Sequence, residues 1–596
     1  MKTRSWKRFG SCLMALAMVL SGTALPASAA TPGKDGSAEM NEAYAAHESL
    51  MPIGPSFSVA TLLEWTPESD PDARYSRASI PMANREGGFV VNPKANPEAK
   101  LMLCSLANSS HDTTSSQGTE NFMSWSFNYW QYTDSFVYWS GSEEGLICCP
   151  TGEFTDAAHT NGVPVVATLG FPWGSGSGYA EEVDAFCQKA EDGSFPVADK
   201  LLEVMDYYGF DGYFFNQESF GCSAEIASRL DEMIRYMRAK CPDILISWYD
   251  SMLPSGGVSY QNAVNSSNQR WMERSDDGSV GINEFFMNYN WYIGQISTTV
   301  STMNSINRSP FDAYAGLDVQ QNGMNTPFRD ELLVDEDGKL KLSIALYCPN
   351  STLGNSANGA QFHEVEQDFY VNSASDPRVE VANVSSSTWL GMSRFFADKT
   401  PILSTPFVTS FNSGHGVGYY VNGELSRDNE WSYQSVQDVM PTWTWIIDSD
   451  GSKLDGGYDF TDAYNGGTSI QFYGDLDANK ANDIMLYSTD VAVTDGMTLS
   501  LTAKNDDGKA RLVAYYGNDS TASYEECETV AYDLTASEAD TWTTTVVDIS
   551  DHAGKTLYAI GLKVESDTAV SDYHINLGQL AILDQRASAH ALYNPA

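Results

Sequence analysis

Short apolar runs alternate with helix-like segments between about residues 130 and 420. The runs that predict strands are 135–138, 164–171, 212–215, 244–248, 284–291, 313–319, 342–347 and 406–411. An alternation of strands and helices over roughly 300 residues is typical of a parallel sheet, and about eight strands favour a (β/α)8 barrel. The sequence therefore predicts an α/β fold with a TIM-type barrel.

The clearest helical pattern runs from residue 224 to residue 240. Its apolar positions 226, 230, 233, 234 and 237 lie on one stripe of a helix with 3.6 residues per turn. Ser223 stands before the pattern as an N-cap, Glu225 lies in the first turn, and Cys241-Pro242 ends it. We expect one amphipathic helix that packs on the barrel.

From about residue 455 the pattern changes to a two-residue alternation of apolar and polar positions, interrupted by Asn, Asp and Gly. The predicted strands are 468–473, 484–487, 497–503, 510–516, 529–534, 542–549, 556–564 and 575–583. This alternation is typical of antiparallel sheets with one buried face. It predicts a C-terminal antiparallel β-sandwich, of the jelly-roll type.

The first thirty residues have the pattern of a bacterial-type export signal. Lys2 and Arg4 open a basic stretch, 13–20 is apolar, and 27–29 reads Ala-Ser-Ala. The pattern predicts a protein that is secreted or at the cell surface.

Four segments are therefore expected along the chain. They are a signal peptide (1–30), a loose leader (31–50), the barrel (51–450) and an accessory β-sandwich (451–596).

The charge balance and the cysteine spacing of the chain limit which partners and cofactors are expected. The 34 Lys and Arg against 78 Asp and Glu give a net charge of −44, so nucleic acid and anionic membranes are poor partners. After the signal, eight cysteines are scattered from Cys104 to Cys527 without the spacing of a zinc site. We expect no metal or other cofactor, and either buried free thiols or one or two incidental disulfides.

The most informative stretch is 208–219, which reads Tyr-Gly-Phe-Asp-Gly-Tyr-Phe-Phe-Asn-Gln-Glu-Ser. Asn216 and Glu218 follow an apolar strand two residues apart, so both side chains point to the same face. In a parallel barrel, catalytic groups lie at the carboxyl ends of strands. An acid flanked by Phe214, Phe215 and Phe220 would be partly desolvated, which raises its pKa and keeps a transferable proton near neutral pH. The alternative is that the two residues only cap the strand.

A resemblance to a known family favours the catalytic interpretation. The matching blocks, in order, are Tyr-Trp-Gln-Tyr (129–132), Ala-Ala-His-Thr-Asn-Gly-Val (157–163), Asp-Gly-Ser-Phe-Pro (192–196), Lys-Leu-Leu-Glu (200–203), Asn-Gln-Glu (216–218), Trp-Tyr-Asp-Ser-Met (248–252), Tyr-Gln-Asn (260–262), Phe-Phe-Met-Asn-Tyr-Asn-Trp (285–291), Tyr-Ala-Gly-Leu-Asp-Val (314–319), Thr-Ser-Phe-Asn-Ser-Gly (409–414) and Gln-Asp-Val-Met-Pro-Thr-Trp (437–443). Over about 120–445 the chain resembles the endo-β-N-acetylglucosaminidases of glycoside hydrolase family eighty-five.

The resemblance implies a single-acid, retaining mechanism that cleaves the N-acetylglucosamine (GlcNAc)-β1,4-GlcNAc core bond of N-glycans. The substrate's own acetamido group is the nucleophile and forms an oxazoline, with transglycosylation as a further outcome. By position, Glu218 matches the acid/base, Asn216 the residue that holds the acetamido group, and Tyr249 a tyrosine of the pocket. We expect a monomer in which the barrel (51–450) is the catalytic domain and the β-sandwich (451–596) is an accessory, carbohydrate-binding-like domain.

Substrate contacts are expected from six further residues. Trp291 matches an aromatic of the pocket wall, and Trp173 lies in a loop at the mouth. The remaining expected contacts are Asn290, Asp250, Gln217 and Asp318, with helix or loop capping as the alternative for the two aspartates and Asn290. Core packing is the alternative for Tyr249 and Trp291.

Two other functions stay open at this point. A family-eighteen-like chitinase or endoglycosidase has a D-G-x-D-x-D-x-E motif, whereas 211–218 carries Phe214 and Asn216 in place of the inner aspartates. A glycan-binding protein without activity would have no need of a desolvated acid, so Glu218 argues against it.

Overall fold

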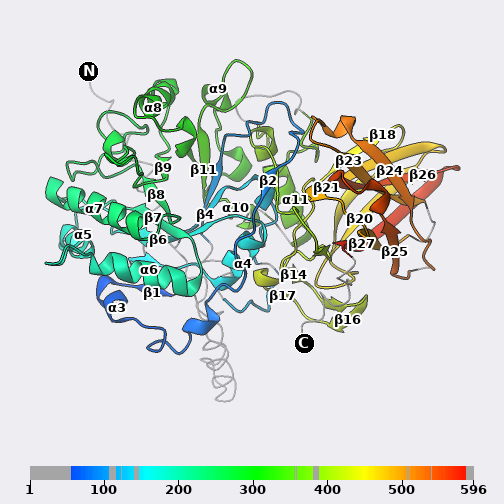
Figure 1. The fold of residues 1–596 in the computed structure, drawn as a ribbon, viewed down its shortest axis with the longest axis horizontal. Helices are drawn as coiled ribbons and strands as arrows, with labels where there is room; N and C mark the ends of the chain where they lie inside the picture. Colours follow the sequence, from blue (N-terminus) through cyan, green and yellow to red (C-terminus); the bar gives the residue numbers. More distant parts are fainter. Residues whose placement is uncertain are drawn as a thin grey trace, which may run out of the picture. The chain divides into compact units, whose positions relative to one another are not determined.

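Eight parallel strands close into a barrel (Figure 1). In chain order they are β3 (Leu101–Leu106), β4 (Ser135–Trp139), β6 (Val165–Gly170), β7 (Gly212–Asn216), β8 (Leu245–Tyr249), β9 (Glu284–Met287), β10 (Ala313–Asp318) and β11 (Ser343–Tyr347). The last strand pairs in parallel with the first, with Ile344 opposite Leu101, and this pairing closes the ring. The predicted (β/α)8 barrel is confirmed.

The structure is a computed structural model. It describes residues 55–106, 116–122, 124–139, 146–354, 356, 359–379, 388–505, 509–538 and 540–584. The predicted signal peptide and leader lie outside these residues.

Helices connect the barrel strands and pack against them. The helices in this part of the chain are α3 (Val59–Glu64), α4 (Gly152–Thr160), α5 (Tyr179–Phe186), α6 (Pro196–Tyr208), α7 (Ala224–Lys240), α8 (Ile293–Ser305), α9 (Asp330–Leu333), α10 (Ser351–Gly354) and α11 (Gly359–Tyr370). α6 begins at Pro196, whose fixed φ suits a first helical position, and ends at Gly209, which has a φ of 80°. This left-handed cap turns the chain directly into β7.

The predicted amphipathic helix is α7, with the expected bounds. The Ser223 side chain accepts a hydrogen bond from the Ile226 amide and caps it, and Cys241 follows its last turn. Leu230, Met233 and Ile234 are buried in the barrel's outer core.

One of the eight predicted barrel strands is wrong. The run 406–411 contains β13 (Phe407–Thr409), which pairs antiparallel with β27 (Val570–Leu583) of the C-terminal sheets. The first strand of the barrel is β3 (Leu101–Leu106), which lies before residue 130, where the predicted alternation begins. A short apolar run carries the tendency to form a strand but no information about its partner. The run 284–291 is also shorter than predicted, because β9 ends at Met287.

Two antiparallel sheets make up the C-terminal region. One contains, in spatial order, β18 (Ile446–Ser449), β21 (Lys480–Ala492), β26 (Thr556–Ser566), β23 (Ala510–Gly517) and β24 (Glu528–Asp533). The other contains β19 (Asp455–Asp459), β20 (Ser469–Leu476), β27, β22 (Thr498–Lys504) and β25 (Thr543–Asp548), with β13 beside β27. Both sheets contribute to one core, for example Ile484 from the first and Leu501 from the second. The predicted antiparallel sandwich is therefore present.

Short strands complete the fold. They are β1 (Ser56–Phe57), β2 (Glu86–Gly87), β5 (Ile147–Cys148), β12 (Lys399–Thr400), β14 (His415–Gly416), β15 (Tyr419–Val421), β16 (Glu424–Arg427) and β17 (Trp431–Ser432). Within the described ranges, no helix combines the length and apolarity that crossing a bilayer requires. The eight cysteines found there are free thiols, six of them buried.

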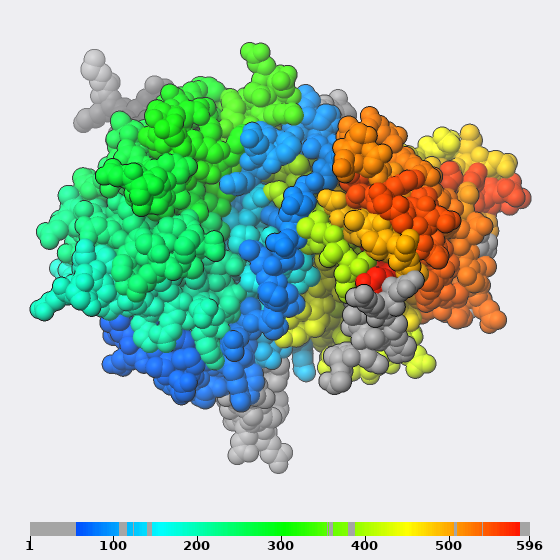
Figure 2. Space-filling view, viewed as in Figure 1, coloured from blue at the N-terminus to red at the C-terminus, as the bar shows by residue number. Residues whose placement is uncertain are grey.

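The segment before β3 packs against both halves of the chain. Figure 2 shows it in blue, running over the surface between the barrel in teal and green and the C-terminal sheets in orange. The Phe89 ring lies 5.0 Å from that of Tyr524 in the sandwich. The two halves also meet directly, because the Arg378 guanidinium, which follows α11, donates to both oxygens of Asp448 in β18 at 2.9 and 2.8 Å.

Candidate active site

The carboxyl end of β7 brings Asn216 and Glu218 together. Asn216 Nδ2 donates to Glu218 Oε2 at 3.0 Å, as the shared direction of the two side chains predicts. An ionised carboxylate only accepts hydrogen bonds, so the NH2 of Asn216 must be the group that faces it. The Asn216 carbonyl oxygen is therefore directed away from Glu218 and can serve as an acceptor for another group.

Burial raises the pKa of the Glu218 carboxyl, and hydrogen bonds from Tyr260 and Asn216 partly offset that rise. The expected flanking by three phenylalanines is only partly correct. Phe214 lies inside the barrel, but Phe215 faces the outer core beside Trp248, and Phe220 is 40% exposed. Alternate strand residues face opposite sides, which is why Phe215 cannot reach the acid.

Tyr260 is the residue of the site that the sequence reasoning missed. Its phenol donates to Glu218 Oε1 at 2.5 Å, so each oxygen of the acid has its own donor. Tyr260 lies in the loop after β8, where no periodicity points to a role. The one available signal was its place in the block 260–262.

Asp250, expected to bind a sugar hydroxyl, is hydrogen-bonded to neighbouring loops of the protein in this structure. Its carboxylate accepts from the backbone amides of Gln261 (3.2 Å), Asn262 (2.5 Å) and Asn288 (3.5 Å), and from Asn268 Nδ2 (3.3 Å). It is 1% exposed, and burial raises its pKa to about 6. The capping alternative describes Asp250: it fixes the loop that carries Tyr260.

Tyr249 ends β8 inside the barrel and is 7% exposed. Its phenol donates to Asn288 Oδ1 at 3.3 Å. Its ring centroid lies 6.1 Å from that of Tyr260, whose phenol donates to Glu218, so Tyr249 lies beside the residue that contacts the acid. Burial raises the pKa of the Tyr249 phenol, and the charge of Glu218 adds to the rise. The structure thus brings together the three residues that the resemblance implies are catalytic.

Trp173 lies at the mouth beside Tyr260, where its indole N–H donates to the phenol oxygen at 3.3 Å. Its loop is tied to the acid's own loop, because the Gly174 amide donates to the Glu218 carbonyl at 3.0 Å and the Phe220 amide donates to the Gly174 carbonyl at 2.7 Å. The Trp173 and Phe220 rings are exposed, with centroids 6.4 Å apart.

The other four expected contacts each hydrogen-bond to a group other than the acid. Gln217 is fully buried, and its amide donates to the Ser219 carbonyl, so it faces away from Glu218. Trp291 is 7% exposed and donates from its indole to the Gly316 carbonyl at 2.8 Å. Asn290 is exposed. Asp318 is exposed at the end of β10, where it accepts from the Gln320 amide at 3.1 Å.

Three aromatic side chains that the sequence did not single out extend the apolar lining of the barrel mouth. The Tyr347 ring lies 6.0 Å from Trp139 and 5.8 Å from Tyr289, and Trp139 lies 6.1 Å from Phe214. They come from the ends of different strands, so only the closed barrel brings them together.

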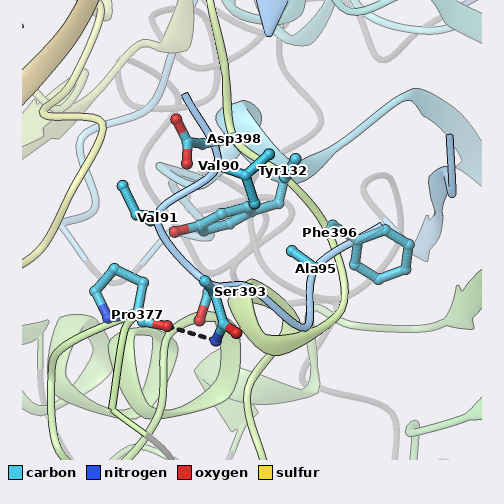
Figure 3. A pocket seen from close by; sticks show the side chains of 10 residues that line it. Val90, Val91, Ala95, Tyr132, Pro377, Ser393, Phe396 and Asp398 are labelled. Carbon is cyan, nitrogen blue, oxygen red and sulfur yellow. Dashed lines mark hydrogen bonds between the residues drawn. The ribbon is translucent and has the colours of Figure 1, made fainter. Parts of the chain in front are cut away.

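A separate small hollow lies away from the acid (Figure 3). The Asn92 amide donates to the Pro377 carbonyl across one side of it at 2.7 Å. It has no residue from the β7 or β8 ends; the lining residues are Val90, Val91, Asn92, Ala95, Tyr132, Pro377, Ser393, Phe396, Ala397 and Asp398. In the part of the chain that the structure describes, no three His, Cys, Asp or Glu side chains are grouped as a metal site.

A closed parallel barrel that presents a desolvated acid beside an amide at a strand end has the arrangement of a barrel enzyme that uses general acid catalysis. Residues 107–419 match the model of Glycosyl hydrolase family 85. The chain belongs to glycosyl hydrolase family 85, and the predicted resemblance is confirmed.

Solved and curated proteins agree with this assignment. The crystal structure of the glycoside hydrolase domain of Endo-D from Streptococcus pneumoniae R6 is 37% identical with a TM-score of 0.84, over 90% of this chain and 84% of that one. Cytosolic endo-beta-N-acetylglucosaminidases of Gallus gallus and Homo sapiens are each 26% identical, over 70% and 75% of this chain and 51% and 56% of theirs. The chain thus spans about half the length of the curated relatives it matches.

The prediction of a secreted or cell-surface protein with a signal peptide is contradicted by this finding. The curated relatives carry the word cytosolic in their names. The prediction rested only on the local composition of the first thirty residues, which lie outside the described residues and say nothing about the barrel.

Proposed function

We propose that this chain is an endo-β-N-acetylglucosaminidase that hydrolyses the GlcNAc-β1,4-GlcNAc core bond of N-glycans. Glu218 is the acid/base and Asn216 orients the acetamido group of the substrate. The observation that carries the proposal is the 3.0 Å hydrogen bond from Asn216 Nδ2 to Glu218 Oε2, which aims the Asn216 carbonyl oxygen away from the acid.

In the first step, the Glu218 carboxyl gives its proton to the glycosidic oxygen, and the bond from that oxygen to C1 breaks. The acetamido oxygen forms a new bond to C1, which closes an oxazolinium ring. The Asn216 carbonyl oxygen accepts the acetamide N–H, whose positive charge grows as the ring closes. An interaction that strengthens in this way stabilises the transition state more than the ground state.

In the second step, Glu218 acts as a base. It takes a proton from a water molecule whose oxygen attacks C1, and the C1 bond to the acetamido oxygen breaks. Two inversions at C1 give net retention. A sugar hydroxyl in the place of water would give transglycosylation.

The surroundings of Asp250 support a nucleophile supplied by the substrate. A two-carboxylate mechanism needs a second carboxylate with an oxygen free to attack C1. Asp250 is the acid that ends the neighbouring strand, and its oxygens already accept four hydrogen bonds. It is therefore poorly suited to be a nucleophile.

We assign the remaining roles as follows. Tyr249 hydrogen-bonds near the oxazoline, the exposed ring of Trp173 stacks on a sugar, and Asn290 and Asp318 bind sugar hydroxyls at the rim. The chain acts as a monomer, with residues 51–450 as its catalytic part. We assign the region 451–596 as a jelly roll that braces the barrel. Its Trp542 is covered by Tyr464 and Lys504, so this side chain offers no open surface on which a sugar could stack.

A defined N-glycoprotein tests the proposal. After incubation with the protein, mass spectrometry should show the loss of all but one GlcNAc at each glycosylated asparagine, and Glu218→Gln should leave the glycan intact. Chitin oligosaccharides serve as the competing substrate. Their cleavage with an intact N-glycan would contradict the proposal.

A further inference from the structure

Three loops meet at the acid, and each follows one of three neighbouring barrel strands. Trp173 comes after β6, Glu218 after β7 and Tyr260 after β8. The indole nitrogen of Trp173 lies 3.3 Å from the Tyr260 phenol oxygen, which lies 2.5 Å from Glu218 Oε1. A continuous row of hydrogen bonds therefore leads from the exposed mouth to the acid.

When Glu218 is ionised, the direction of this row is fixed by chemistry. An indole N–H can only donate, and an ionised carboxylate can only accept. The Tyr260 phenol has one proton, so it must accept from Trp173 and donate to Glu218. A phenol that accepts a hydrogen bond becomes a stronger donor, because hydrogen bonds in a chain polarise one another.

We propose that Trp173, Tyr260 and Glu218 form a relay in which Trp173 sets, through Tyr260, how readily the acid gives up its proton. The relay rests on the proposed function of Glu218 as the acid. Tyr260 stabilises the carboxylate that remains after proton transfer, and Trp173 is a positioning residue that strengthens this effect. A sugar that stacks on the exposed Trp173 ring would thereby be coupled to the acid.

The surroundings hold the relay in place. The loop of Tyr260 is clamped by Asp250 through the amides of Gln261 and Asn262, and the loop of Trp173 is tied to the backbone of Glu218 and Phe220. The titratable groups that face Glu218 from neighbouring elements are the phenols of Tyr249 and Tyr260. Among the described residues, its pKa responds to burial, Tyr260 and Asn216, with no cation involved.

The test is the pH dependence of kcat/KM on an N-glycopeptide, whose alkaline limb reports the free enzyme's acid. Tyr260→Phe removes the donor to the ionised form, so the pKa of Glu218 rises and the limb should move up by about one pH unit. Trp173→Phe keeps a ring but removes the N–H, and should move the limb in the same direction by about 0.3 unit. In the Tyr260→Phe background, Trp173→Phe should cause no further shift.

Phe220→Leu is the matched control. It removes the other ring of the exposed pair but no hydrogen bond, so it should alter KM and leave the limb where it is. The relay is overturned if Trp173→Phe shifts the limb equally with and without Tyr260, if Phe220→Leu shifts it as much, or if neither relay variant shifts it. A wild-type protein that leaves N-glycopeptides intact would instead overturn the proposed function.

Discussion

Two neighbouring strands of the barrel end in carboxylates with opposite characters. Burial raises the pKa of both Glu218 after β7 and Asp250 after β8. Glu218 accepts one hydrogen bond on each oxygen, from Tyr260 and Asn216, whereas Asp250 accepts four, three of them from backbone amides. A raised pKa alone therefore does not identify the acid. The difference lies in the acceptor capacity that stays open towards substrate.

The two residues also depend on one another. The backbone amides that Asp250 holds belong to the loop of Tyr260, and Tyr260 donates to Glu218. In the proposed function one carboxylate, Glu218, is the reactive group, and the other fixes the geometry of its donor. Substitutions at the two strand ends should consequently have different effects, one mainly on activity and the other on both stability and activity.

Glu218→Gln should produce the largest effect, a loss of hydrolysis of roughly 100- to 10,000-fold, because the amide has no proton to give. Its fold should remain intact. The raised pKa means that the ionised carboxylate is costly in the folded state, so above that pKa the free energy of unfolding should be no lower than that of wild type. Release of glycan measures the first quantity, and urea unfolding over a series of pH values measures the second.

Glu225→Gln is the control for this change. Glu225 lies exposed in the first turn of α7, and its variant should keep wild-type turnover. Normal hydrolysis by a folded Glu218→Gln protein would refute the assignment of the acid.

Asp250→Asn should combine a loss of stability with a smaller loss of activity. An asparagine offers one acceptor oxygen and turns an NH2 towards the amides of Gln261 and Asn262, and an unsatisfied buried donor costs about 1–3 kcal/mol. As the loop of Tyr260 loosens, we expect a loss of activity of roughly 10- to 100-fold. The exposed Asp243→Asn is the matched control. Wild-type stability together with wild-type activity would show that Asp250 is no anchor.

The smallest effect is the pH dependence of this change. Asp250 has a pKa of about 6 in the folded protein, against about 3.9 in an unfolded chain. Between these values the folded state binds more protons, so this residue's contribution to stability is full below about pH 4 and is lost as the pH rises through about 6. The difference in unfolding free energy between wild type and Asp250→Asn should therefore shrink over this range. A difference in unfolding free energy that does not change with pH would contradict a raised pKa of the buried Asp250 carboxyl.

Local patterns in the sequence predicted much of the fold. The stripe of α7 and the alternation of the C-terminal strands are properties of neighbouring residues, so both were recovered closely. The partner of a strand is not a local property. For this reason the apolar run 406–411 predicts a barrel strand, although in the structure its strand β13 pairs with β27.

The candidate site shows the same limit. The two-residue spacing of Asn216 and Glu218 required that they share a face, and the structure places them in contact. The same alternation turns Gln217 to the other face, away from Glu218. Nothing in the spacing could reveal that the Asp250 carboxylate already accepts four hydrogen bonds, or that Tyr260 reaches across from another loop. These facts depend on how loops fold over the barrel mouth.

In the proposed function Asn216 positions the substrate's own nucleophile. The activity of Asn216→Gln on two donors, an intact N-glycan and a preformed oxazoline, tests this role directly. Asn216→Gln should lose roughly 100-fold or more of its activity on an intact N-glycan, because its carbonyl no longer orients the acetamido group. A preformed sugar oxazoline has already passed that step. With this donor, the variant should still transfer the glycan to an acceptor GlcNAc at close to the wild-type rate. An equal loss on both donors, or a trapped glycosyl–enzyme ester, would contradict the account.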